Sequence, residues 1–370
     1  MRGEIMWVEK RGDKYLAVDR FIDPMTGKRK RVSVIMDKNT AQSRNKAKEI
    51  LHAKKTVQKI EQPKTTLKDL ETAYIAYQRK LYKESTTKRN EIVLNVVVEI
   101  LGSDTLCARL TAGMILSALL STQKPNVTLN SYLTRLKAML RWGYQHDLCP
   151  DIAPKLSAFP DKSEREKISD KFLEKDELKK LLDGMKVEHW QSLTRLLVLS
   201  GLRIGEALAL DYDDIDLVNR LIHVTKTFDR TTGTITTPKT ADSVRDVYMQ
   251  KELYRLCRKL LSKAKRQSLE CGYQNKIVFC DMTGNRYTYD VYEKYLRENS
   301  VKIIGRKITS HVMRHTMTSL FAEAGVPLDV IARRLGHHDS RLTRDIYLHC
   351  TQAQQKKDHD AVKNVVLVGI

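Results

Sequence analysis

From Leu67 onward the sequence keeps a helical pattern for about 80 residues, and this run limits the folds that are open to the chain. Apolar residues recur three and four positions apart, as in Leu129, Leu133, Leu136 and Leu140. Proline-containing segments border the run on both sides. The pattern predicts a small helical bundle with its own core. A chain of 370 residues is too long for one ordinary core, so further domains must flank this bundle.

The segment before the bundle is short and basic. "IMWVEK", "KYLAVDRFI" and "KRVSVIM" have the composition of strands, and the turn signals "RGD" and "DPMTGK" separate them. A helix over "NTAQSRNKAKEILHAKK" follows, opened by Asn39 or Thr40. Residues 1–60 hold 16 Lys plus Arg against 7 Asp plus Glu. Such a unit can lay a sheet face or edge on DNA; on charge alone, a solvated basic surface is the alternative.

The charge of the whole chain indicates its class of partner. The formal net charge is +21 and the pI is near 9.6, which favours a polyanion such as nucleic acid over an anionic membrane surface. Aromatic residues make up only 6%, so contacts to a duplex backbone are favoured over base stacking on single strands. The six cysteines form no CxxC pair, and no apolar run reaches transmembrane length. We therefore expect a cytoplasmic protein that handles nucleic acid.

The segment "HWQSLTRLLVLSGLRIGEALAL" predicts one helix that ends at Gly201 and another that begins near Arg203. A cation at a helix N-terminus opposes the macrodipole, which makes sense where an anion is held. Glu206 is placed to brace the guanidinium from the same face. A surface Arg–Glu pair is the alternative.

A run of short strands is predicted next, in "LIHVTKTFDRTTGTITTPKTADSVRDVYM", as a meander with a turn at "DRTTG". Lys239 lies in the loop between two of these strands. Taken alone, a lysine in a loop is most simply explained as a solvated side chain.

The segment "TSHVMRHTMTSLFAEAG" predicts a helix capped by Thr309 or Ser310 and ended by Gly325. One stripe of this helix is apolar, and the opposite side is polar or solvated. The polar side carries His311, Arg314, His315 and Thr318. The two histidines have the spacing of metal ligands, but no acidic residue lies between them, so a metal is disfavoured.

The segment "VPLDVIARRLGHHDS" predicts a helix from Pro327 to Gly336. His337 and His338 then lie in the turn before another helix, which Asp339 or Ser340 can cap. Tyr347 falls about two turns into that helix. With 15 tyrosines in the chain, packing is the simplest role for any single one.

Taken together and in order, "SGLRIGEAL", "TPKT", "HVMRH", "LGHH" and "DIYLH" resemble the signature of the tyrosine recombinases, the phage-integrase family. The resemblance covers residues 172–350. It implies a multidomain α+β fold with a basic sheet-plus-helix domain that binds arm-type DNA (1–60) and a helical core-binding bundle (61–150). A linker (151–171) and a mainly helical catalytic domain with a small antiparallel sheet and a C-terminal tail (172–370) would follow.

The resemblance also assigns roles to residues. It implies that one scissile phosphate is surrounded by Arg203, Lys239, His311, Arg314 and His337, and that Tyr347 attacks it. His311 would be the base, Lys239 the acid that protonates the leaving 5′-oxygen, and His337 a hydrogen-bond donor. The product would be a 3′-phosphotyrosyl link that requires no metal or other cofactor. His315 and His338 receive no role.

The implied protein is a site-specific DNA recombinase that integrates or excises a phage or an integrative mobile element. Its implied partners are double-stranded DNA attachment sites, other copies of the chain in a homotetramer, and accessory DNA-bending or directionality proteins, with no membrane. The expected location is the bacterial cytoplasm, at the nucleoid. The alternatives are DNA relaxation of the type IB topoisomerase kind and a non-catalytic DNA-binding protein. The apolar tail at Val365 to Val368 is expected to add to a sheet edge of the next subunit in the tetramer, and packing within its own subunit is the alternative.

Overall fold

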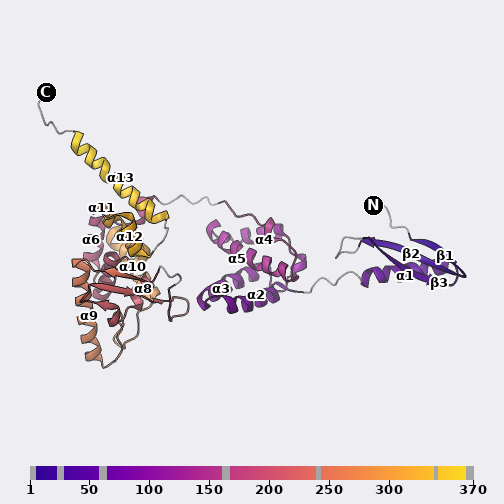
Figure 1. Cartoon of the computed structure of the whole chain (residues 1–370), viewed down its shortest axis with the longest axis horizontal. Coiled ribbons are helices and arrows are strands. Elements are labelled where there is room, and N and C mark those ends of the chain that lie inside the picture. The colour runs from indigo at the N-terminus through magenta and orange to yellow at the C-terminus, as the bar shows by residue number, and fades with distance from the viewer. Residues whose placement is uncertain are drawn as a thin grey trace. The chain divides into compact units, whose positions relative to one another are not determined.

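The computed structural model describes residues 6–22, 29–57, 65–160, 167–238, 243–336 and 341–363 (Figure 1). The chain divides into two compact units, residues 1–83 with 89–161 and residues 84–88 with 162–370. Within the described residues the elements fall into a sheet with one helix, a helical bundle, and a larger mixed segment. This is the multidomain α+β architecture that the sequence predicts.

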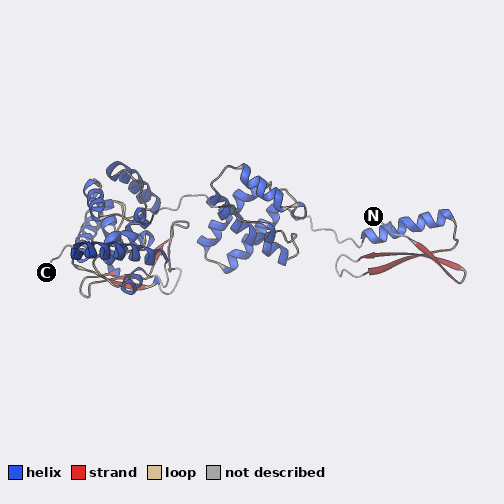
Figure 2. Ribbon diagram, turned by 90° about the horizontal axis from the view of Figure 1, so that it is seen from above, coloured by secondary structure: helices blue, strands red, loops and turns tan. Residues whose placement is uncertain are grey.

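The N-terminal segment is a three-stranded antiparallel sheet with one helix on it. Strands β1 (Trp7–Arg11), β2 (Lys14–Ile22) and β3 (Arg29–Met36) pair in that order, and α1 (Ala41–Val57) packs on one face (Figure 2). Alternate side chains of the strands point to this face. Ala17 of β2 is buried there against Leu51 of α1. The predicted strands and helix are confirmed.

The other face of this sheet carries an aromatic ring between two cations. Trp7 pairs with Val18, the neighbour of Ala17 in β2. Because successive side chains of a strand point to opposite faces, Trp7 and Val18 face away from α1. The guanidinium carbons of Arg20 and Arg31 lie 5.1 and 5.9 Å from the centre of the Trp7 ring, within the range of cation–π contacts. Glu9 accepts hydrogen bonds from Trp7 Nε1 at 2.9 Å and from Arg31 Nη2 at 2.7 Å. These contacts hold the ring and one guanidinium in place on this face.

The bundle is formed by α2 (Leu67–Leu81), α3 (Glu84–Leu101), α4 (Ala112–Ser121) and α5 (Asn126–Gln145), with short 3-10 turns at Cys107–Arg109 and Ala153–Lys155. The four predicted leucines of α5 are all buried in its core. Thr66 caps α2: its hydroxyl accepts from the Asp69 N–H, and the Asp69 carboxylate accepts from the Thr66 N–H. The packing continues to Phe159, whose N–H and C=O both bond the Asn130 amide. The bundle therefore includes part of the segment that the sequence placed in a linker.

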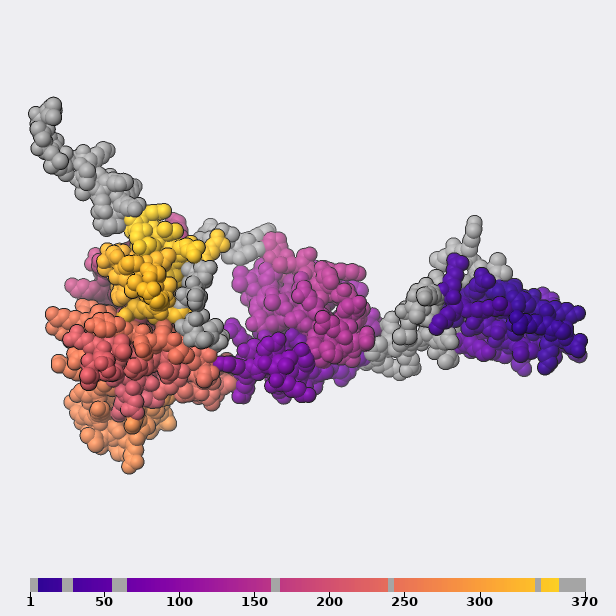
Figure 3. Space-filling view, in the orientation of Figure 1, coloured from indigo at the N-terminus to yellow at the C-terminus, as the bar shows by residue number. Residues whose placement is uncertain are grey.

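The third segment contains most of the helices. They are α6 (Lys175–Gly184), α7 (Glu188–Ser200), α8 (Ile204–Ala209), α9 (Lys251–Cys271), α10 (Tyr289–Ile304), α11 (Ser310–Glu323), α12 (Leu328–Leu335) and α13 (Arg341–Lys363), with 3-10 turns at Ile168–Lys171 and Tyr212–Asp214. One hydrophobic cluster joins α7, α9, α10 and the small sheet. A second cluster lies under α13, where Ile346 and Cys350 are buried with Met317 of α11. In Figure 3 the yellow surface of this last part of the chain lies against the orange surface of earlier residues.

The strands of this segment differ from the predicted single meander. Strands β4 (Ile215–Asp216), β5 (Leu221–Val224) and β8 (Arg245–Tyr248) form one antiparallel sheet. Within the described residues, β6 (Thr227–Phe228) and β7 (Ile235–Thr236) form a separate two-stranded pair. The chain leaves the first sheet at Lys226, whose ammonium is held by Asp211 at 2.5 Å and Asp214 at 2.7 Å. The hairpin is thus an insertion between β5 and β8, and Lys239 follows it in sequence.

In the described part of the chain, no helix has both the length and the apolar character needed to cross a membrane.

Candidate active site

Arg203 lies in the turn between α7 and α8. The helix α7 ends at Gly201, which adopts a left-handed conformation with φ of 73°, and the chain turns so that Arg203 becomes the N-cap of α8. Its side chain is 34% exposed. Arg203 Nη1 donates to Glu206 Oε1 at 2.7 Å, and the Arg203 N–H donates to Glu206 Oε2 at 2.9 Å. The predicted helix boundaries and the predicted brace are both confirmed.

Glu206 is not part of a surface pair, because it is only 3% exposed. Burial alone would raise the pKa of this carboxyl. Hydrogen bonds and charge from Arg245, together with the charge of Arg203, outweigh burial and hold the pKa of Glu206 below its usual value. Glu206 is therefore an ionised carboxylate shared by two guanidiniums. The alternative of a surface pair is excluded.

Arg314 lies on α11 and is 5% exposed. Its Nη1 donates to the carbonyl of Gly201, and its Nη2 donates to the carbonyl of Leu335. Both carbonyls lie at helix C-termini, where they lack a partner within their own helix. Burial, then repulsion from Arg203, lowers the pKa of Arg314 to about 9, so the group stays charged at neutral pH. Arg314 thereby joins the end of α7, two residues before Arg203, to the end of α12, two residues before His337.

The polar side of α11 differs from the solvated face that was one of the sequence-based alternatives. Arg314 and Thr318 are buried, and only His311, in the first turn, is exposed. His315 is partly buried, and burial together with the charges of His311 and Arg314 lowers its pKa to about 4. This side of the helix is covered because the ends of α7 and α12 pack on it through the contacts of Arg314.

Tyr347 lies in the second turn of α13 and is partly buried. It packs against the hydrophobic cluster that includes Phe172, Met317 and Leu335. Met317 is one turn from Arg314 on α11, and Leu335 supplies a carbonyl to Arg314. The same cluster thus fixes the position of α13 relative to the helix that carries Arg314.

Two of the predicted site residues, Lys239 and His337, lie outside the described residues, as do His338, Asp339 and Ser340. The residues that flank these gaps are described. Ser243 is buried just beyond the Lys239 segment, and Gly336 ends α12 with φ of 64°. The helix from Pro327 to Gly336 is confirmed, with Pro327 as its N-cap.

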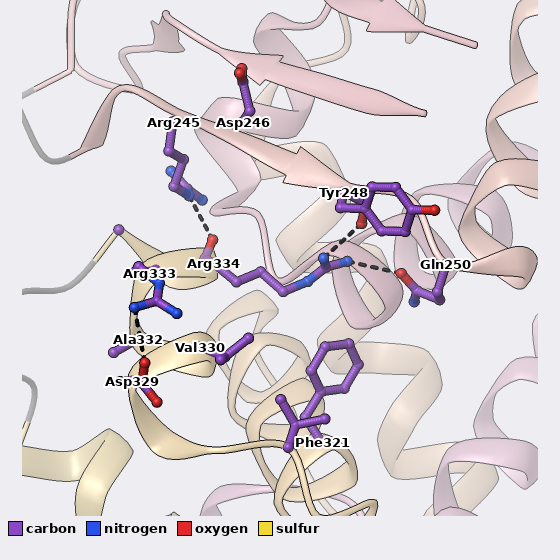
Figure 4. A pocket seen from close by; sticks show the side chains of 12 residues that line it. Arg245, Asp246, Tyr248, Gln250, Phe321, Asp329, Val330, Ala332, Arg333 and Arg334 are labelled. Atoms are coloured by element: carbon purple, nitrogen blue, oxygen red, sulfur yellow. Dashed lines mark hydrogen bonds and ion pairs between the residues drawn. The ribbon is translucent and has the colours of Figure 1, made fainter. Parts of the chain in front are cut away.

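Arg245 and Arg334 belong to the same network, and the sequence analysis missed both. Arg245 binds the carboxylate of Glu206. Figure 4 shows its contact with the carbonyl of Arg334 and the contacts of Arg334 with Tyr248 and Gln250. Arg334 also donates to the carbonyl of Leu199 at 3.0 Å. The sequence did contain an indication of the position of Arg245. In a strand, residues 245, 247 and 249 lie on one face, and because Val247 and Met249 are apolar, this face is expected to point inward. An arginine on an inward side needs a buried acidic partner.

The arrangement is suited to an oxyanion. The guanidiniums of Arg203 and Arg245 bind the one carboxylate of Glu206, and their charges act on the nearby guanidinium of Arg314 and add to the effect of burial in lowering its pKa. The excess positive charge is partly desolvated, which strengthens its attraction for a phosphate. Among the described residues no group of histidines, cysteines and carboxylates is arranged to hold a metal ion.

Comparison with known proteins extends this interpretation. Residues 171–354 match the family model described as the phage integrase family. The probable integrase of prophage ps2 from Lactococcus lactis is 26% identical over 369 residues, which cover 94% of this chain and 96% of that protein. Among solved structures, the Tn1549 transposon integrase in complex with a circular intermediate DNA has a TM-score of 0.64 at 22% identity, over 79% of this chain and 99% of that chain.

A lambda integrase tetramer bound to a Holliday junction has a TM-score of 0.58 at 15% identity, over 91% of this chain and 96% of that chain. These structures share the fold. The family match begins before α6, ends within α13, and includes every motif that carried the resemblance. The chain therefore belongs to the phage integrase family and is a tyrosine-type site-specific recombinase.

Proposed function

We propose that Tyr347 is the nucleophile of this recombinase and that Arg203 and Arg314 stabilise the scissile phosphate. The Tyr347 phenol oxygen forms a bond to phosphorus, and the bond from phosphorus to the 5′-oxygen breaks. His311 takes the phenol proton, and Lys239 gives a proton to the leaving oxygen. His337 donates a hydrogen bond to the same phosphate. A 5′-hydroxyl of the partner duplex then reverses the step and completes strand exchange.

The observation that carries this proposal is the double contact of Arg314 with Gly201 and Leu335. One buried side chain joins the turn that bears Arg203, the helix that bears His311, and the helix that ends before His337. Residues from motifs more than 100 positions apart are thus brought to one place. A DNA-binding surface alone would not need a buried guanidinium at this junction, since exposed cations suffice for phosphate contacts.

We further propose that the partner is duplex DNA carrying attachment sites, with four protomers acting together. The lambda integrase tetramer on a Holliday junction and the Tn1549 integrase on DNA support this assignment by their shared fold. Accessory DNA-bending or directionality proteins would set the direction of the reaction. We propose that recombination takes place in the bacterial cytoplasm, at the nucleoid.

The N-terminal sheet is proposed to bind arm-type DNA with the face opposite α1. Trp7, Arg20 and Arg31 gather on that face, so it offers cations beside a flat ring. A β-ribbon or sheet can enter a DNA groove and contact both phosphates and base edges. The division proposed from the sequence, 1–60 for arm DNA and 61–150 for core DNA, assigns the two kinds of site to separate segments.

Trapping on a nicked substrate tests the catalytic proposal. When the top strand carries a nick just beyond the scissile phosphate, the released fragment diffuses away and the covalent complex accumulates. The parent protein should form a denaturant-resistant adduct, and Tyr347→Phe should form none while its affinity for the same DNA stays within about twofold. The matched control is Tyr292→Phe, which also loses a single hydroxyl, one bonded to Thr194 in the core. It should still form the adduct. Adduct formation by Tyr347→Phe would refute the assignment.

A further inference from the structure

Arg245 is a buried guanidinium next to the proposed phosphate site. Its Nη1 and Nη2 donate to the two oxygens of Glu206 at 3.1 and 2.9 Å. Its Nε donates to the carbonyl of Arg334 at 2.7 Å, and Nη1 also donates to the carbonyl of Ser243 at 3.1 Å. The side chain is 6% exposed. Arg245 is therefore turned inward, with its donors used on protein acceptors.

Glu206 connects this guanidinium to Arg203. Glu206 Oε1 accepts from Arg203 Nη1 at 2.7 Å and from Arg245 Nη1 at 3.1 Å. Arg203 also contacts both oxygens of Glu206, through Nη1 and through its backbone N–H at 2.9 Å, but both of these bonds come from the residue that Glu206 has to orient. Two parallel bonds from a planar fork set the plane of the carboxylate as well as its position. The direction in which Glu206 holds Arg203 thus depends on Arg245.

The backbone contacts of Arg245 place this pair in a larger frame. Figure 4 shows the guanidinium reaching the carbonyl of Arg334 at the end of α12. The next carbonyl, that of Leu335, accepts from Arg314. Both arginines that are proposed to contact the phosphate are therefore connected to the C-terminus of α12. Arg314 binds it directly, and Arg203 is connected to it through Glu206 and Arg245.

We propose that Arg245 is a positioning residue for strand cleavage: it orients Arg203 through Glu206 without contacting DNA. This rests on the proposed role of Arg203 at the scissile phosphate. A misplacement of about 1 Å in a catalytic group can cost about 10²-fold in rate. A lysine at position 245 keeps the charge but is a single point donor, so it cannot hold both oxygens of Glu206 in plane.

The test measures single-turnover adduct formation by Arg245→Lys on the nicked attachment-core duplex. Adduct formation should slow by roughly 10–100-fold, with unchanged affinity for the duplex. A second substrate carries a methylphosphonate at the scissile position, where a methyl group replaces one charged non-bridging oxygen. That substrate has less charge for Arg203 to stabilise. On it, the rate of adduct formation by Arg245→Lys should therefore be within a few-fold of the parent rate.

Two further variants separate positioning from a loss of folding. Arg306 has the same pattern of contacts, two bonds to the carboxylate of Glu177 and two to backbone carbonyls, but it touches neither Glu206 nor Arg203. Arg306→Lys should lower thermal stability, and its effect on the rate of adduct formation should be the same on the two substrates. In the background of Arg203→Ala, Arg245→Lys should cause no further loss, because the residue through which it acts is gone.

The outcomes are distinct. An equal defect of Arg245→Lys on both substrates, or a full additional loss in the Arg203→Ala background, would overturn the positioning role. A 5′-bridging phosphorothiolate has a better leaving group than the normal 5′-oxygen. If only this substrate restored the cleavage rate of Arg245→Lys, the defect would lie in protonation of the leaving group, which would also contradict the positioning role. If the parent protein forms no adduct on any attachment-core duplex, the proposed function fails first. Arg245→Lys reacting at the parent rate would leave that function intact and remove only Arg245.

Discussion

Arg203 and Arg314 are proposed to share one phosphate, yet their surroundings differ. Arg203 is about one-third exposed and forms an ion pair with a carboxylate. Arg314 is buried and donates hydrogen bonds to the terminal carbonyls of two helices. An exposed cation contributes to function with little effect on stability. A buried guanidinium that satisfies orphaned carbonyls contributes to both, because its removal leaves buried acceptors unpaired.

Arg203→Ala and Arg314→Ala should therefore differ in stability while sharing a loss of activity. Each should slow adduct formation by roughly 10²-fold or more, since each removes charge stabilisation in a partly desolvated site. Arg314→Ala should in addition lower the free energy of unfolding by about 2–4 kcal/mol, while Arg203→Ala changes it little. Urea denaturation and single-turnover cleavage, measured on both variants, check this. Equal stability of the two variants would contradict the structural role of Arg314.

His315 should make the catalytic segment less stable in mild acid. Burial, with repulsion from His311 and Arg314, lowers its pKa to about 4 from the ordinary 6.5. Between these values the unfolded chain binds a proton that the folded chain does not, so stability falls as the pH falls from 6.5 toward 4. The loss from this group between pH 7 and pH 5 should be about 2 kcal/mol. His315→Gln should lose less stability over that interval; an identical loss in variant and parent would exclude His315 as the cause.

At the scale of elements, the end of α7 is the tightest junction of the site. A Cβ built on Gly201 would lie 2.3 Å from Met317 Cε and 3.0 Å from Leu335 Cδ2, and the backbone there is left-handed. The end of α9 at Gly272 has a similar φ of 75°, but nothing lies within 4 Å of a Cβ built there. The two glycines therefore share one conformational requirement and differ in packing.

Gly201→Ala should cost more than Gly272→Ala. The left-handed backbone penalises both by about 1 kcal/mol, and overpacking against Met317 and Leu335 adds about 1–3 kcal/mol for Gly201 alone. Adduct formation should also fall only for Gly201→Ala, because a shift of this junction moves Arg203 and the carbonyl that Arg314 binds. Thermal melts and cleavage assays on the pair decide the matter. Equal effects would mean that the junction is not tightly packed.

Most elements of this fold are predictable from local patterns, and the exceptions have physical causes. The three- and four-residue spacing of the α5 leucines predicts its buried side, and Gly201 and Gly336 mark helix ends through left-handed geometry. The pairing of β5 with β8 was not predictable, because it is a long-range contact across the inserted β6–β7 hairpin. The motifs that carry the proposed site residues were recognisable in the sequence. Arg245 was missed because its partner Glu206 lies 39 positions away, in a separate motif.

At the scale of the whole molecule, the N-terminal sheet is predicted to be dispensable for cleavage. Its core of Ala17, Met36, Ala47 and Leu51 is distinct from the hydrophobic core of the helical bundle. Deletion of residues 1–60 should leave cleavage of a core-only substrate intact and weaken integration on full attachment sites. Within the intact chain, Arg20→Ala with Arg31→Ala should have the same effect. Equal recombination by the truncated and full-length proteins on full sites would contradict the division of labour.

The C-terminal tail, Val365 to Val368, lies outside the described residues, and its addition to a sheet edge stays a prediction. In its sheet β8 is bonded on one side only, to β5, within the described residues. A hollow of about 980 Å³ lies beside it, lined in part by Tyr248, Phe321 and Val330 (Figure 4). Strand addition to such an edge can occur within one subunit or between subunits.

Truncation after Asp360 distinguishes the two arrangements of the tail. If the tail binds a neighbouring subunit, the truncated protein should still bind single sites but lose synaptic complexes on a native gel. Unchanged synapsis with a lower melting temperature would show that the tail packs within its own subunit.

The most direct test of the central claim is the chemical identity of the covalent link. The adduct trapped on the attachment-core duplex can be digested with protease and nuclease, and the remaining nucleotide-bearing peptide sequenced by mass spectrometry. The prediction is a peptide containing Tyr347 joined to a 3′-phosphate, with a free 5′-hydroxyl on the released strand and full adduct yield in the presence of a metal chelator. A link to any other residue, or to a 5′-phosphate, would contradict the proposed mechanism.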